Sequence, residues 1–241
     1  MNRPRKSLND KYTIKDLNLI HKLIVEVKVI KSSTILLNPS WNKRLDARVT
    51  IFSKLINALN CAELALRLKT KHLNRIDWWE ETYQIKANSS SLNVTLFKIE
   101  FDTFLRIAYI HSVFSAIESS LRQYIKVVNN SVEDSRKGFK SIYSDLLKCA
   151  DLQDQENILD LLRLLRNLVH NNGVYFDRCG DETVIFRNQE FKFIEGKTVI
   201  FVSWELLIKL VYDISKLISD LNKSSIIRSL ENVEDPFAVQ K

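Results

Sequence analysis

The stretch "TLFKIEFDTFLRIAYIHSVFSAIESSLRQYIKVV", residues 95–128, decides the fold of this chain. It has a helical period, and neither glycine nor proline interrupts the sequence from Leu92 to Val128. This pattern predicts an amphipathic helix. With a rise of about 1.5 Å per residue the helix would be roughly 55 Å long, more than a typical globular helix. We therefore expect one very long helix, with a kink or break as the alternative.

Residues that break helices are scarce outside this stretch too. The 241 residues include 4 glycines and 3 prolines, and Gly138 is the only glycine before Gly173. Short strands and tight turns need such residues, so their scarcity favours long helices. Hydrophobic residues make up 45% of the chain, which is enough to build a real core.

The N-terminal third is expected to be helical and basic. Residues 1–12 are predicted to be a disordered tail, and Thr13 with Asp16 resembles a capping box that opens a helix over 13–31. The β-branched residues of that segment leave a strand as the alternative. Further helices are expected at 43–72, 139–149, 154–172 and 203–223, the last opened by Ser203 as its N-cap.

Near residue 183 the period of the hydrophobic pattern changes from 3.6 to 2. The segments "TVIFRN", "QEFKFIEG" and "KTVIFVS" predict a β-hairpin or small meander at about 183–202. The fold class is therefore mainly α, a helical bundle with a small β-hairpin inserted before the last long helix, plus an N-terminal helical region. We place the boundaries of these parts at 1–90, 91–225 and 226–241, with a Ser-rich connector before 91 and a frayed C-terminal tail.

Charge and cysteine content narrow the function classes. Residues 1–76 contain 16 Lys and Arg but only 5 Asp and Glu. Such an excess of positive charge is expected either where a protein contacts a nucleic-acid backbone or where lysines lie on a solvated helix face. Just after this region, Trp78 and Trp79 are expected to be a buried anchor, with base stacking as the alternative. The three cysteines are widely separated, so they predict neither a disulfide framework nor a metal pair. The sequence contains no long uncharged apolar run, so neither export nor a membrane span is predicted. A cytoplasmic location is expected.

A second stretch, "RLLRNLVHNNGVYF" at 163–176, is polar where a leucine-rich helix ends. On a helix, Arg163, Arg166, Asn167 and His170 fall within an arc of roughly 100°, opposite the leucines. Cations gathered on one face repel one another, so an anion is expected to neutralise them. That anion is either a ligand or a set of carboxylates from neighbouring helices, and Gly173 is expected to end the helix as its C′ residue.

The segment "LRNLVHNNG", together with "HSVFSAIESSLRQY" on the earlier long helix, the hairpin and the final helix, resembles the HEPN superfamily of nucleotide-binding domains. The resemblance covers about residues 92–223 and implies a HEPN-like bundle of four or so helices. The family motif is an Arg, usually followed by a polar residue, and a His after four to six intervening residues. Arg166 precedes Asn167 but is separated from His170 by three residues, whereas Arg163 is separated by six and precedes a leucine. Which arginine has the family role stays open.

The resemblance implies a metal-independent endoribonuclease that cleaves single-stranded RNA, in prokaryotic toxin or anti-phage defence systems. His170 would exchange a proton as a 2′-hydroxyl attacks phosphorus, and Arg166 or Arg163 would hold the phosphate. A homodimer would supply the second half of the site. An antitoxin or another regulatory protein is a further partner of the kind that the resemblance allows.

Three side chains are candidates for orienting or binding roles. Glu118 lies on the long helix and is expected either to orient a motif arginine or to pair with Arg122 four residues later. Asn167 and Asn171 are candidates for contacts with phosphate or ribose. His21, His72 and His111 are expected to be ordinary surface or core-edge residues.

Other chemistries lack their motifs. The chain has no glycine-rich phosphate loop, HExxH, paired Cys and His set or GxSxG, which argues against a P-loop nucleotidase, a zinc enzyme and a serine hydrolase. We expect no cofactor, no metal and no membrane partner. Two alternatives to the ribonuclease remain, namely a non-catalytic module that binds RNA, a nucleotide or a partner protein, and a structural helical adaptor.

Overall fold

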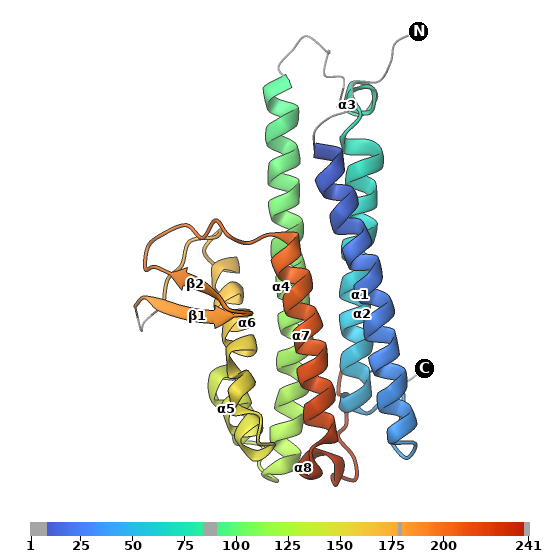
Figure 1. The fold of residues 1–241 in the computed structure, drawn as a ribbon, viewed down its shortest axis with the longest axis vertical. Coiled ribbons are helices and arrows are strands. Elements are labelled where there is room, and N and C mark those ends of the chain that lie inside the picture. Colours follow the sequence, from blue (N-terminus) through green and yellow to red (C-terminus); the bar gives the residue numbers. More distant parts are fainter. Residues whose placement is uncertain (1–8, 84–90, 178–179, 239–241) are drawn as a thin grey trace.

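The computed structural model describes residues 9–83, 91–177 and 180–238, and these form a mainly helical protein with one small sheet (Figure 1). The expected mainly α class is confirmed. Of the tail expected at 1–12, residues 9–12 belong to the first helix. Residues 1–8 and the Ser-rich connector at 84–90 lie outside the described residues.

Four long helices form the main body of the protein (Figure 1). They are α1 (Asn9–Leu37), α2 (Ala47–Leu68), α4 (Ser91–Val128) and α7 (Trp204–Lys223). The stretch at 95–128 is one unbroken helix, because nothing in it interrupts the hydrogen-bond ladder and it packs against several neighbours along its length. The helix α7 begins about halfway along α4, so the N-terminal half of α4 extends beyond it (Figure 1).

The first helix is longer than expected. It begins at Asn9, so Thr13 lies inside the helix and the predicted capping box is wrong. The strand alternative is also wrong, because the apolar residues are spaced for one helical face and are buried together. These residues are Ile20, Leu23, Ile24 and Val27.

The helix α2 begins at Ala47 rather than at 43, because Asp46 is its N-cap and its side chain accepts from the Arg48 backbone N–H. A π-helical turn (Lys69–Leu73) and the short helix α3 (Ile76–Tyr83) follow. The span Ala47–Leu73 is long and apolar enough to cross a membrane by length and composition, but 56% of its most apolar window is buried inside the bundle. Such burial is typical of a core helix in a soluble protein.

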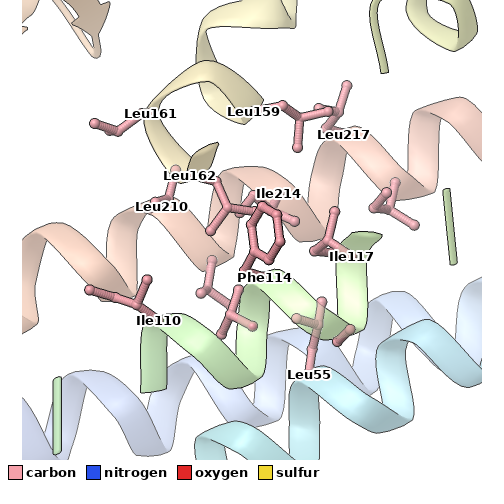
Figure 2. Packing of buried hydrophobic residues seen from close by; sticks show 14 of the residues in the cluster. Leu55, Ile110, Phe114, Ile117, Leu159, Leu161, Leu162, Leu210, Ile214 and Leu217 are labelled. Carbon is pink, nitrogen blue, oxygen red and sulfur yellow. The ribbon is translucent and has the colours of Figure 1, made fainter. Parts of the chain in front are cut away.

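A smaller layer formed by α5 (Phe139–Cys149) and α6 (Glu156–Val169) packs on α4. Figure 2 shows Phe114 and Ile117 of α4 facing leucines of α6 and the apolar face of α7. One hydrophobic core extends through these layers and includes residues from Ile20 to Val233. It holds α6 and its polar end firmly against α4.

The β-hairpin consists of β1 (Glu182–Phe186) and β2 (Gln189–Phe193), paired antiparallel. Its turn residues Arg187 and Asn188 have φ of 50° and 62°, as a two-residue hairpin turn requires. Of the two expected alternatives the structure has the hairpin, and the meander, with a third strand within "KTVIFVS", is wrong. Backbone groups of that segment instead bond to the loop after α6, where Val199 N–H donates to the Gly173 carbonyl at 2.9 Å.

The C-terminal tail does not fray over residues 226–238, contrary to expectation. A short helix α8 (Ser225–Arg228) follows α7, and Val233 is fully buried. Its carbonyl accepts from the Ala47 N–H at 2.7 Å. The fully buried Arg48 donates to the carbonyls of Ile227 and Leu230 at 3.0 and 2.8 Å, which explains why this segment is held against the bundle.

Candidate functional site

The polar end of α6 comes three residues earlier than expected. The helix ends at Val169, and His170 is its C-cap residue, so the expectation that Gly173 is the C′ residue is wrong. Gly173 lies further along the loop with a φ of +87°, and its N–H donates to the Leu168 carbonyl at 2.9 Å. The motif side chains are therefore presented on the last turns of a helix whose leucine face is buried.

Arg163 is surrounded by carboxylates and only 15% exposed. It lies 2.5 Å from Glu182 of β1, 3.6 Å from Asp160 on its own helix and 3.7 Å from Asp177 in the loop after α6. Three negative charges thus surround one guanidinium. Arg163 is neutralised within the chain, which is the outcome expected if the motif cations pair with neighbouring carboxylates.

Two tyrosines extend this cluster. The Tyr143 hydroxyl donates to Asp160 at 2.5 Å, and the Tyr175 hydroxyl donates to Glu182 at 2.9 Å. Burial, together with these carboxylates, raises the pKa of both hydroxyls. Burial would lower the pKa of Arg163, but the hydrogen bond to Glu182 and its charge raise it above the ordinary value. The cluster therefore ties α5, α6 and the hairpin together.

Arg166 has a different environment. Its guanidinium carbon lies 5.1 Å from the centroid of the Phe114 ring on α4, a cation–π contact. Its Nε atom is buried and has no hydrogen-bond partner. Within the described part of the chain no carboxylate lies within 4.0 Å of this guanidinium, since the ion pairs there do not include Arg166. Among the described residues, then, Arg166 is a cation without a counter-ion.

His170 is exposed one helical turn beyond Arg166. Asn167 lies between these two residues in the sequence and Asn171 follows them, and both asparagines form hydrogen bonds within α6 and the loop after it. Asn167 donates to Asp177 at 3.1 Å, and Asn171 donates to the Asn167 carbonyl at 3.4 Å. The structure therefore brings Arg166 and His170 to one open face and places Asn167 at the border between them and the carboxylates.

Glu118 makes the simpler of its two expected contacts. Its carboxylate lies 2.6 Å from Arg122, four residues later on α4, and Arg122 also donates to the carbonyls of Ser135 and Lys137. Among the contacts of the described residues, none joins Glu118 to Arg163 or Arg166. Glu118 therefore holds Arg122, which binds the loop before α5, instead of orienting the motif.

The aromatic pair in the N-terminal third is in part a structural anchor. Trp79 is buried, and its indole N–H donates to the Leu73 carbonyl at 2.8 Å, so the anchor interpretation holds for Trp79. His21 lies 3.3 Å from Glu63, an ordinary surface contact. Across residues 9–83, 91–177 and 180–238, no group of three or more His, Cys, Asp or Glu could hold a metal ion. Cys61 and Cys149 are free and exposed.

Several residues around the motif were not identified from the sequence. Asp160 could have been found, because it lies three positions before Arg163 on the same helix. Asp177, Glu182 and Phe114 carry no local signal, because the loop, the hairpin and α4 approach α6 only in the folded chain. Comparison with protein-family models, with curated proteins and with solved structures finds no match to this chain.

Proposed function

We propose that the chain is a metal-independent endoribonuclease of HEPN type, which cleaves single-stranded RNA in the prokaryotic cytoplasm as a toxin or defence protein. The observation that carries the proposal is the charge of Arg166, which no carboxylate of the described residues neutralises, beside the exposed His170. Arg163 is occupied by three carboxylates, so Arg166 is the motif arginine in this proposal. The short spacing between Arg166 and His170 is one helical turn, which places both side chains on one face.

The reaction needs a cation at the phosphate and groups that move two protons. The 2′-hydroxyl oxygen attacks the adjacent phosphorus and loses its proton, the bond from phosphorus to the 5′-oxygen breaks, and that oxygen gains a proton. Products are a 2′,3′-cyclic phosphate and a 5′-hydroxyl. Arg166 is suited to stabilise the charge that develops on the phosphoryl oxygens, and His170 to accept or donate one proton.

A single imidazole performs only half of this proton transfer, so a second group is required. His170 of the partner subunit in a homodimer is one source. His111 is another, because it is exposed on α4 one turn before Phe114. The helices α4 and α6 run in opposite directions (Figure 1). His111 precedes Phe114 on α4 and His170 follows Arg166 on α6, so both histidines are displaced in the same direction from the contact between Phe114 and Arg166.

The test is cleavage of a labelled single-stranded RNA in the presence of EDTA. Wild type should cleave it, and His170→Ala should lower the rate by about 10²–10⁴-fold, as loss of a proton-transfer group does. Arg166→Met should have a similar effect. His111→Ala lowers the rate only if His111 is the second proton carrier. Arg163→Met is the matched control, since it should preserve cleavage per folded molecule; equal RNA ladders from wild type and His170→Ala would refute the proposal.

A non-catalytic binding module is the second candidate. It is favoured by the fact that only one exposed imidazole belongs to the motif in each chain. It predicts RNA binding that weakens with salt and with Arg166→Glu, without any cleavage. Gel-shift titration at increasing salt, run beside the cleavage assay, separates the two functions.

A further inference from the structure

An apolar cavity of about 720 Å³ lies at the end of the bundle where α2, α3 and α4 meet. Its size falls in the range of small-molecule sites, roughly 300–1,000 Å³. It is lined mainly by aromatic and aliphatic side chains with few polar groups. The lining residues that carry the argument are Leu68, His72, Trp78, Phe97, Glu100 and Phe104.

The aromatic wall of the cavity is held in place and partly open to solvent. Phe97 stacks on the anchored Trp79, with ring centroids 5.9 Å apart and an interplanar angle of 15°. Trp78 meets Trp79 edge to face at 5.1 Å. Phe104 is 63% exposed and lies two helical turns after Phe97 on the same side of α4. Exposed aromatic surface around a preformed hollow is typical of a binding site.

Glu100 sets the charge of the site. It is exposed, and within the described residues it has neither a hydrogen bond nor an ion pair. Two cations of the adjoining turns, Lys69 and Arg75, pair with Asp102 and Asp77 and not with Glu100. Aromatic faces carry partial negative charge, and an unpaired carboxylate would lose its hydration without compensation under a neutral apolar occupant. Both features favour a positively charged occupant and disfavour phosphate or nucleic acid.

We propose that this cavity binds a compact apolar organic cation, of the quaternary ammonium or phosphonium class. The aromatic rings contact its apolar body and stabilise its charge by cation–π interaction, and Glu100 neutralises it from the rim. The site is separate from Arg166 and His170, so the proposal stands independently of the RNA chemistry.

The probes are tetraphenylphosphonium and tetraphenylborate, which share size and apolar surface and differ in the sign of their charge. Binding to the full chain is measured by isothermal titration calorimetry at about pH 8. We expect the cation to bind about ten-fold more tightly than the anion. The net charge of +7 would favour the anion, so this preference could not come from the protein's overall charge.

Two variants and two matched controls locate the site. Glu100→Gln should weaken phosphonium binding about three-fold, and Phe104→Ser should weaken it at least as much. Glu231→Gln, at another exposed carboxylate, and Ile200→Ser, at a side chain that is 90% exposed, should leave it unchanged. Because Phe104 and Glu100 are exposed, these substitutions should preserve folding, which circular dichroism verifies.

Three results would overturn the proposal. Equal or tighter binding of the borate would show that the cavity does not select cations. Unchanged phosphonium binding in Phe104→Ser and Glu100→Gln would place the probe elsewhere. A wild-type dimer in sedimentation velocity that Phe104→Ser converts to a monomer would show that a second copy of the chain covers the cavity.

Discussion

Replacement of the two motif arginines by methionine should destabilise the fold to very different extents. Arg163 is 15% exposed, and its three carboxylate partners are 17–21% exposed. Removal of one partner from a fully buried ion pair costs about 3–5 kcal/mol, and from an exposed pair less than about 1 kcal/mol. Arg163→Met, which leaves three carboxylates close together, should therefore cost about 2–3 kcal/mol. For a domain of this size that lowers Tm by about 5–10 °C.

Arg166→Met should cost less than about 1 kcal/mol, because among the described residues the interaction that it removes is a cation–π contact with Phe114. Methionine keeps much of the aliphatic volume, and the buried Nε without a partner disappears with the guanidinium. Thermal unfolding of the three proteins by circular dichroism provides the comparison. Adding Glu182→Gln to Arg163→Met should recover part of the loss, as expected for directly coupled charges.

A fall in Tm for Arg166→Met as large as that for Arg163→Met would refute this reasoning, since Arg166 would then have a structural partner. An unchanged Tm for Arg163→Met would show that the carboxylate cluster does not stabilise the fold. Either result would also remove the argument that Arg166 is the arginine available for a ligand.

The remaining predictions concern the bundle and the motif loop. Arg48→Met should lower the free energy of unfolding by about 3–5 kcal/mol in urea titrations, because it leaves the buried Asp46 without its counter-ion. Burial alone would raise the pKa of Asp235, but hydrogen bonds from Thr50 and Lys54 hold it below its ordinary value of 3.8. Its stabilisation is therefore present above about pH 4 and lost as pH falls through the folded pKa, so Asp235→Asn should show a shallower loss of stability in acid than wild type. Gly173→Ala should lower the free energy of unfolding, measured in urea, by about 1 kcal/mol through backbone strain at φ +87°. No steric clash should add to this cost, since the new Cβ would meet no atom within 4 Å.

Local pattern was sufficient for much of the fold. The unbroken period over 95–128 predicted α4, and Ser203 predicted the start of α7. These elements depend on neighbours in sequence, through helical spacing and capping bonds. The alternative of a strand within "KTVIFVS" was wrong because the conformation of that segment does not depend on its sequence neighbours. Its backbone partners lie in the loop after α6, about 25 residues earlier in the chain.

The motif shows the same division. The sequence by itself determined that Arg163, Arg166, Asn167 and His170 share one helix face, since that follows from 3.6 residues per turn. Only the tertiary structure decided which cation is neutralised, because Glu182 and Asp177 reach Arg163 from the hairpin and the loop. Arg166 faces the Phe114 ring on α4 and keeps its charge available. Side chains from elements far apart in the chain set the electrostatics of α6, and no spacing within the helix encodes them.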